Sequence, residues 1–422
     1  MARRFAMLIA LLAALALLVA ACEDVDPEDD PALDEPEEEE EPEEDEEPEE
    51  DDEPDEPDEP EEDEEPDEEE PDEEDVETGA DVGEDVDPEG DLCVDEAAEV
   101  EAPDDFTVGL VTDIGNVDDG TFNQYAYEGV LEAAECFGID DENIAVIETQ
   151  SEADYERNME SILDADPDVV IPVGFLLQDA TENFAQENED VIYVGVDQFS
   201  DGEIDNFVGL QFREDQGGFL AGAMAALLTE SEIVAAVGGP EDVPAIPRFL
   251  NGYQMGVDHV DPDVTVQEIY IPSFDDPAEG RAAAEQFIGE GADVVFGAAG
   301  VTGSGAIQAA AEQDAWVLGV DQDEYYTTFE EGGVEGSERL ASSAVKRIDV
   351  GVFENIQLII EDQFEPGNFI LDAENEGITL APYNEADIPE DVDSEITEIE
   401  EGLADGSIET GVDPETGELL DE

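Results

Sequence analysis

From about residue 105 onward, the chain alternates between two patterns of apolar and polar positions. Short runs that are apolar on both faces, such as 106–112, 144–148 and 169–174, predict parallel strands buried between layers of helices. The stretches between them carry apolar residues at helical spacing, as in 121–137, and are long enough for right-handed crossovers. This alternation predicts an α/β fold.

A second set of elements repeats the pattern. Further strands are expected at 191–196, 207–212, 233–237, 264–271, 294–296 and 316–320. The repeat restarts at 207–212, which predicts a first lobe over about 105–210 and a second over about 211–346. The helix at 348–360 is expected to return to the first lobe, and the folded domain (105–412) to end near residue 412. Two doubly wound sheets in tandem are the layout of type I periplasmic binding proteins, in which a hinge joins two lobes around an interlobe cleft.

The first 22 residues have the pattern of a secretory signal. Arg3 and Arg4 precede an unbroken apolar run (5–21) that stops at Cys22, which predicts a signal peptide over 1–21. The Leu-Val-Ala-Ala stretch before Cys22 resembles a lipobox, so the cysteine is expected to carry lipid and hold the chain on the extracytoplasmic face of the cell membrane. An uncleaved anchor helix that happens to end in cysteine is the alternative.

The next zone, 22–104, is nearly all Glu, Asp and Pro and has almost nothing to bury. Such a segment cannot offset its ordering entropy, so a disordered acidic stalk is expected. A plain spacer that lifts the domain off the membrane is favoured over a cation-binding tail. The last ten residues, 413–422, are expected to form a short acidic tail.

Charge narrows the set of partners. The chain has 128 Asp and Glu against nine Lys and Arg, a formal net charge of −119, which makes nucleic acid and anionic lipid poor partners. So acidic a surface is typical of proteins that work in high salt, where cations screen the repulsion. Lys346 is the only lysine and His259 the only histidine.

Two cysteines remain after Cys22. Cys93 precedes the folded domain and Cys136 lies near the end of its first helix. Leftover thiols outside the cell often pair, so a Cys93–Cys136 disulfide and two free thiols are both open interpretations.

Polar, aromatic and glycine side chains collect where the expected strands end. Thr121 and Gln124 predict a capping box at the start of the first helix. The residues at these strand ends that could contact a ligand are Asp113, Phe122, Asn123, Asp197, Phe274, Gly300, Asp321 and Lys346. The glycines at 300, 303 and 305 do not have the spacing of a dinucleotide or Walker loop, so a tight cleft backbone is expected there.

Several of these stretches, in this order, resemble a known family. They are 111–113, 118–124 (Asp-Asp-Gly-Thr-Phe-Asn-Gln), 154–158, 217–222, 237–239, 300–305, 319–323 (Gly-Val-Asp-Gln-Asp) and 345–347. Together they resemble the basic membrane protein (BMP) family of ABC-transporter lipoproteins, whose nucleoside-binding members form the PnrA-like group. The resemblance covers roughly residues 106–412.

The resemblance implies a role for each aromatic and first-lobe residue. Phe122 and Phe274 would sandwich a base, with Phe249 as the alternative to Phe274, because stacking suits a flat heterocycle. Asp113, Asn123 and Asp197 would bond to base edges or ribose. From the residues alone, Phe122 could instead belong to the core, and the two aspartates could cap helices.

The remaining residues are expected on the sugar side. Asp321 would accept from ribose hydroxyls, Lys346 would donate to the sugar, and Gly300 would let the backbone approach the ligand. Lys346 could instead neutralise buried carboxylates.

An enzyme is not expected. His259 lies in an acidic run with no cysteine or serine partner, and no His/Cys metal cluster or cofactor motif is present, although acidic pairs are too numerous to exclude a glycosidase-type site. The resemblance implies capture of a nucleoside, expected to be a purine, by a monomeric lipoprotein that serves an ABC permease. The alternatives are a sugar or other small metabolite in the same fold, or a surface interaction or sensing lipoprotein.

Overall fold

The computed structural model describes residues 92–94 and 97–420. The signal peptide, the lipidation of Cys22 and the stalk up to residue 91 lie outside the described residues and stay predictions. No helix in the described part of the chain is both long and apolar enough to cross a membrane.

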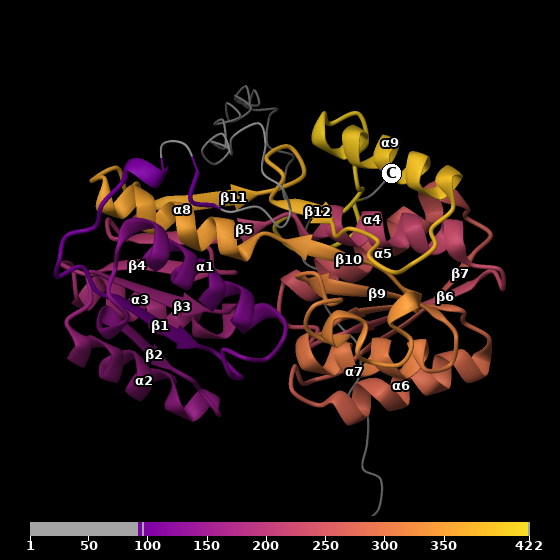
Figure 1. Ribbon diagram of the computed structural model, residues 1–422, viewed down its shortest axis with the longest axis horizontal. Coiled ribbons are helices and arrows are strands. Elements are labelled where there is room, and N and C mark those ends of the chain that lie inside the picture. The colour runs from indigo at the N-terminus through magenta and orange to yellow at the C-terminus, as the bar shows by residue number, and fades with distance from the viewer. Residues whose placement is uncertain (1–91, 95–96, 421–422) are drawn as a thin grey trace, which may run out of the picture. The chain divides into compact units, whose positions relative to one another are not determined.

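The first half of the described chain alternates strand and helix (Figure 1). Its elements are β1 (Val108–Thr112), α1 (Phe122–Phe137), β2 (Ile144–Ile147), α2 (Tyr155–Ile162), β3 (Val169–Val173), α3 (Gln178–Glu187), β4 (Ile192–Val196) and β5 (Phe207–Phe212). These strands pair in parallel with one another, and β11 (Gly367–Leu371) adds in parallel to the edge beside β5. The sheet order is β11-β5-β4-β3-β1-β2.

The second half builds another six-stranded sheet. Its elements are α4 (Glu214–Leu228), β6 (Ile233–Gly238), α5 (Ala245–Val260), β7 (Thr265–Tyr270), α6 (Pro277–Glu290), β8 (Val294–Ala298), α7 (Gly300–Ala311), β9 (Trp316–Asp321), β10 (Leu340–Lys346), α8 (Ile348–Ile360), β12 (Ile378–Leu380) and α9 (Glu390–Ala404). The sheet order is β12-β10-β9-β8-β6-β7, and only β12 runs antiparallel. The predicted fold class, two doubly wound α/β lobes, is confirmed.

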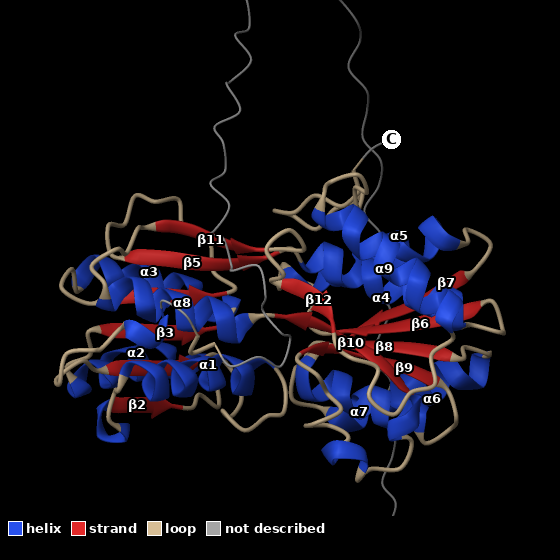
Figure 2. Cartoon of the chain, turned by 45° about the horizontal axis from the view of Figure 1, so that its top comes forward, coloured by secondary structure: helices blue, strands red, loops and turns tan. Residues whose placement is uncertain are grey.

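Each sheet is buried on both faces, as apolar parallel strands require. In the first lobe, α1 and α8 share one core with the sheet, and α2 and α3 share the other. In the second lobe, α4, α5 and α9 pack on one face, and α6 and α7 on the other. Figure 2 shows the strands of each sheet between these helices.

The chain passes between the lobes three times: from β5 to α4, from β10 to α8, and from β11 to β12. The expectation that the second unit restarts with the strand at 207–212 is wrong, because this strand is β5 of the first sheet. Apolar periodicity identifies a buried strand but does not tell which sheet it joins, and the structure has the first crossing after Phe212 rather than near residue 210.

The predicted capping box at the start of α1 does not form. The Thr121 side chain makes no capping hydrogen bond. The Asp119 carboxylate instead accepts from the backbone N–H groups of Thr121, Asn123 and Gln124, so one acidic residue satisfies several free donors of the first turn. Gln124 Oε1 accepts from the Gly120 N–H.

The C-terminal residues are more ordered than an acidic tail. Residues Val412 and Leu419 form an antiparallel bridge, and Asp413 accepts from two backbone N–H groups of the turn between them. This turn lies on α5, where Asn251 Nδ2 donates to the Gly417 carbonyl at 2.7 Å. Hydrogen bonding by its backbone, which composition does not reveal, holds the segment in place.

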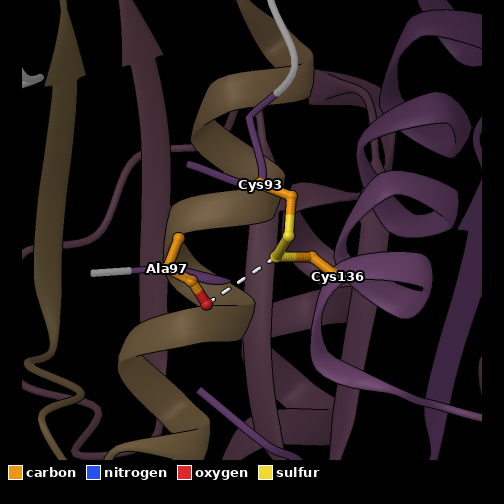
Figure 3. The surroundings of a disulfide bond; sticks show 3 residues. All are labelled: Cys93, Ala97 and Cys136. Carbon is orange, nitrogen blue, oxygen red and sulfur yellow. Dashed lines mark hydrogen bonds between the residues drawn. A yellow bond between two sulfur atoms is a disulfide. The ribbon is translucent and has the colours of Figure 1, made fainter. Parts of the chain in front are cut away.

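A disulfide joins Cys93 to Cys136 in the last turn of α1 (Figure 3). Close by, the Ala102 N–H donates to the Phe137 carbonyl at 2.9 Å. Of the two interpretations left open by the sequence, the structure has the paired cysteines, and the segment before β1 is fastened to the far end of α1.

Candidate functional site

One pocket receives residues from both lobes and from the crossing between them. All eight candidate ligand residues line it: Asp113, Phe122, Asn123, Asp197, Phe274, Gly300, Asp321 and Lys346. In the first lobe, Asp113 follows β1, Asp197 follows β4, and Phe122 and Asn123 begin α1. In the second lobe, Phe274 follows β7, Gly300 follows β8 and Asp321 ends β9. The pocket therefore lies at the carboxyl ends of the strands, where open α/β sheets bind ligands.

The two lobes contribute a repeated strand end. The tetrapeptide Gly-Val-Asp-Gln occurs at 195–198 and again at 319–322. Asp197 follows β4 and Asp321 ends β9, and these strands occupy the same place in their sheets. The backbone of both aspartates is in the left-handed region, with φ of 59° for Asp197 and 69° for Asp321. This conformation ends a strand, and Asp tolerates it better than most residues do.

Lys346 is buried at the end of β10, with 1% of its surface exposed. Its Nζ lies 2.7 Å from Asp197 Oδ2 and 3.2 Å from Glu214 Oε1. The ammonium also lies 5.1 Å from the ring centroid of Phe122 and 4.7 Å from that of Phe212. Burial lowers the pKa of Lys346, but the neighbouring carboxylates outweigh it and raise the pKa above its usual value. An ammonium has three donors, and two are used here, so one remains for a ligand.

Glu214, the first residue of α4, extends this charge cluster to α5. Its Oε2 lies 2.7 Å from Arg248 Nε on α5, and both side chains are buried. Arg248 Nη1 donates in turn to the Pro414 carbonyl at 3.0 Å. The charges therefore alternate in sign from Asp197 through Lys346 and Glu214 to Arg248, which is how buried charges avoid isolation.

Burial also controls the pocket carboxyls. It raises the pKa of Asp113 to about 7, although the Ile114 N–H lowers it. Burial raises the pKa of Asp321 to about 7 against the opposing effect of Lys346. The pKa of Asp197 is raised as well, by burial first, with Lys346 again opposing. The pocket thus holds carboxyl groups that exchange protons near neutral pH.

Four phenylalanines line the pocket: Phe122 and Phe175 from the first lobe, and Phe249 and Phe274 from the second. Phe274 and Phe122 are partly buried, while Phe249 is 3% exposed and packs edge-on to Phe296 at 6.1 Å. Gly239, after β6, gives Phe274 room, since a Cβ there would lie 2.4 Å from its ring. Phe249 is part of the core, so Phe274 has the freer ring face of the two.

Gly300 begins α7 and has φ of +54°, which favours glycine. A Cβ at this position would meet neighbours only at ordinary contact distance, the nearest at 3.5 Å. The backbone angle, rather than crowding, therefore accounts for glycine here.

Three buried side-chain oxygens at the pocket have no protein partner among the described residues. They are Thr121 Oγ1, just before α1, Asn123 Oδ1, in the first turn of α1, and Asp197 Oδ1, whose other oxygen holds Lys346. The amide and carboxylate oxygens are acceptors, so they are suited to N–H or O–H groups of a ligand.

A hydrogen bond crosses from one lobe to the other beside the pocket. Gln322 Nε2, after β9, donates to the Thr121 carbonyl at the start of α1, at 3.0 Å. Gln198, at the equivalent place after β4, stays within the first lobe and donates to the Gly174 carbonyl at 2.9 Å.

A family model described as "ABC transporter substrate-binding protein PnrA-like" matches residues 106–404. The chain belongs to this family. The expectation from the sequence motifs is therefore confirmed, and the structure is that of an ABC transporter substrate-binding protein.

Relatives of this substrate-binding protein agree. A "CD4+ T-cell-stimulating antigen" of Listeria monocytogenes is 30% identical over 327 residues, 74% of this chain and 89% of the relative. An "ABC transporter nucleoside-binding protein BmpA" of Lactococcus lactis is 28% identical, over 75% of this chain and 84% of its own length. A solved solute-binding protein of an ABC transporter system from Aeropyrum pernix superposes with a TM-score of 0.63 at 26% identity, covering 72% of this chain and 92% of that one.

Membership in a solute-binding family confirms that the chain is not an enzyme. His259 is exposed at the end of α5 and lies beside the Phe219 ring, with centroids 5.3 Å apart. In the described part of the chain, no group of three or more His, Cys, Asp or Glu side chains is arranged to hold a metal ion.

Sequence reasoning missed two residues of the pocket lining, Asp119 and Phe175, and three residues outside the lining that hold Lys346 in place: Phe212, Glu214 and, through Glu214, Arg248. A repeated motif could have pointed to two of them. Arg-x-Asp-x-Gly occurs at 213–217 and 347–351, directly after β5 and β10. In each copy the arginine pairs with the aspartate, at 2.8 Å for Arg213 and 2.9 Å for Arg347. Phe212 directly precedes the first copy, and Lys346 directly precedes the second.

Proposed function

We propose that this protein captures a nucleoside in the pocket and delivers it to the permease of an ABC importer. One observation supports a nucleoside as the ligand. An aromatic ring from each lobe, Phe122 and Phe274, lines the same pocket as carboxylates that can accept hydrogen bonds. Aromatic rings bind the face of a heterocycle, and carboxylates accept from the hydroxyls of a sugar. The named nucleoside-binding relative from Lactococcus lactis supports the same ligand class.

Electrostatics favour a nucleoside over a nucleotide. The pocket lining holds five aspartates against one lysine, and that lysine is already paired with Asp197 and Glu214. A phosphate would meet several carboxylates with no unpaired cation of the pocket lining to receive it, which costs free energy in a site shielded from water. The ligand is therefore proposed to be unphosphorylated.

The membrane attachment is part of the proposal. Cleavage after residue 21 would leave Cys22 as the lipidated first residue, with the acidic stretch as a stalk and the protein working as a monomer. The stalk was expected to reach residue 104, but Ala97, Val100 and Ala102 pack on the core of the first lobe, so it is proposed to end near residue 91. The disulfide at Cys93 fastens the end of this stalk to α1. Metabolic labelling with a fatty acid would detect the lipid, and loss of the label in Cys22→Ser is the expected result.

Calorimetry tests the ligand. The full mature chain, in high salt because of its charge, is titrated with adenosine, guanosine, inosine and ribose. Binding of at least one nucleoside with a Kd of about 1 μM or tighter is expected, corresponding to about −8 kcal/mol. Ribose alone should bind far more weakly because it offers no ring to stack. Heat from ribose but from no nucleoside would reassign the site to a sugar.

The variant Phe122→Ala separates stacking from folding. Loss of one stacked ring predicts at least a tenfold weaker nucleoside affinity, about 1.4 kcal/mol or more, with little change in melting temperature because the ring is only partly buried. Phe199→Ala is the matched control, since Phe199 is 51% exposed and lies outside the pocket lining. An unchanged affinity in Phe122→Ala would remove this ring from the site.

A further inference from the structure

We propose that Asp119 fixes the orientation of the Asn123 amide, so that the pocket selects a ligand presenting an N–H or O–H group to Asn123. Asp119 is then a positioning residue that sets the specificity of the site. The inference rests on the proposed function, because the ligand is taken to be a nucleoside, and it adds which hydrogen-bonding polarity that nucleoside must have at one place.

The Asp119 carboxylate is held by four donors. Its Oδ1 accepts from the backbone N–H groups of Thr121 at 2.9 Å and Gln124 at 3.0 Å. Its Oδ2 accepts from the backbone N–H of Asn123 at 3.2 Å and from the side-chain Nδ2 of the same residue at 2.9 Å. Both oxygens are thus fixed by the first turn of α1, and the carboxylate has no freedom to rotate away.

The Asn123 amide can take only one orientation in this setting. Its Nδ2 donates to Asp119 Oδ2 and also to the Ile114 carbonyl, at 3.1 Å. Both neighbours are acceptors only, so turning the amide over would place Asn123 Oδ1 against a carboxylate and a carbonyl. The hydrogen-bond network therefore determines which atom faces which way, independently of how the two ends of the amide are assigned.

The fixed orientation determines the surroundings of the other atom of the amide, Asn123 Oδ1. Asn123 is 4% exposed and lines the pocket beside Phe122, and its Oδ1 is buried with no protein partner among the described residues. A buried acceptor that has given up water favours a ligand that restores a hydrogen bond and disfavours one that leaves it unpaired. A site of this kind rejects analogues that lack the matching donor much more strongly than it rejects small changes in size.

The experiment measures the affinity of ligands that each lack one hydrogen-bond donor, and identifies the donor whose removal depends on Asn123. The full mature chain is titrated with adenosine and with its analogues lacking the 6-amino group, the 2′-hydroxyl, the 3′-hydroxyl or the 5′-hydroxyl, and with guanosine against inosine for the 2-amino group. In the wild-type protein, one deletion is expected to weaken binding about tenfold or more. The same titrations are run on Asn123→Ala and Asp119→Asn.

In Asn123→Ala, that one deletion should lose its effect, while the other deletions keep theirs, as in a double-mutant cycle between protein and ligand. In Asp119→Asn, the new amide can no longer accept at both positions, so the Asn123 amide is released and the same discrimination should shrink at least threefold. Asp276→Asn is the control, because Asp276 also caps a helix, accepting from the Glu279 N–H at 3.0 Å, but lies outside the pocket lining.

A merely structural role for Asp119 predicts a different result. Affinity would then fall by the same factor for every ligand and the discrimination would stay at its wild-type value, which would overturn the proposal. A wild-type protein that binds nucleosides but shows no deletion coupled to Asn123 would overturn it too, and would leave the proposed function standing. Failure of every nucleoside to bind the wild-type protein would overturn both.

Discussion

The two lobes repeat one chain plan and use it for different chemistry. In both sheets the strand order after the edge strand is the same, and both carry Gly-Val-Asp-Gln at one strand end and Arg-x-Asp-x-Gly after the next strand. Yet Asp197 in the first lobe forms an ion pair with Lys346, whereas Asp321 in the second lobe forms none among the described residues. The equivalent aspartates therefore sit in different electrostatic surroundings.

The difference arises at one position just before the Arg-x-Asp-x-Gly motif and one position inside it. Where the first copy has Phe212 and Glu214, the second has Lys346 and Ile348. One crossing thus supplies the cation, the other supplies the carboxylate, and the two meet with Nζ and Oε1 3.2 Å apart. Two lobes with the same strand order can therefore form one shared site when they differ in only a few side chains where the chain crosses between them.

The largest expected effect comes from removing the shared cation. Lys346→Met leaves Asp197 and Glu214 buried side by side without their common partner, so the free energy of unfolding should fall by about 3–5 kcal/mol. Denaturant unfolding of the ligand-free protein measures it. Arg281→Met is the control, because its ion pair with Glu312 is about two-fifths exposed and should contribute about 0–1 kcal/mol. Equal losses in the two variants would mean that the cluster is no more than a surface ion pair.

A covalent difference between the lobes should give the next largest effect. Both cysteines of the disulfide lie in the first lobe, they are 43 residues apart in the chain, and the second lobe has none. Replacing both by serine should lower the free energy of unfolding by about 2–4 kcal/mol, because the unfolded chain regains the freedom of a closed loop. Hydrogen exchange followed by peptide should show faster exchange in α1 and its neighbours, with α5 to α7 little changed. A uniform loss across both lobes would contradict this picture.

The smallest effect separates the equivalent aspartates. Asp197→Asn should destabilise the ligand-free protein by about 1–3 kcal/mol, because a buried ammonium loses a charged acceptor. Asp321→Asn should differ little from wild type at low pH. Burial raises the pKa of Asp321 from 3.8 to about 7, so the folded state binds its proton more tightly than the unfolded state, and wild-type stability falls as pH rises from about 4 to 7.

The amide at position 321 has no proton to lose, so the stability of Asp321→Asn relative to wild type should increase across that pH range. Chemical unfolding at pH 4, 5.5, 7 and 8 measures the difference, in which the many surface carboxylates cancel. A difference that stays constant with pH would show that Asp321 has the same pKa in the folded and unfolded states and that its burial is compensated in another way.

Much of the fold could be predicted from the sequence because buried parallel strands are apolar on both faces. Ile144–Ile147 and Ile192–Val196 were expected within one residue of their observed ends. The assignment of β5 to a sheet could not be predicted, since a strand at a crossing is equally apolar whichever sheet it joins. The turn that docks on α5 was also missed, because backbone hydrogen bonds to Asn251 and Arg248 leave no trace in composition.

The candidate site divides in a similar way. Asp113, Phe122 and Lys346 stand at recognisable strand or helix ends, so their convergence in one pocket could be anticipated. Glu214 could not, because one glutamate among so many acidic residues gives no signal until its partners are known. The sequence left open whether Lys346 donates to a ligand or neutralises buried carboxylates. The structure gives this lysine two carboxylate partners and also places it in the pocket wall.

The disulfide has a mechanical consequence. Because Cys93 is bonded to Cys136, tension along a tether that ends at Cys93 would enter the folded domain at the last turn of α1. Cys136 lies at one end of α1, while Phe122 begins the other end, about 20 Å away at 1.5 Å per residue. A pulling force on the tether would therefore act on the end of α1 that lies opposite to the residues that line the pocket.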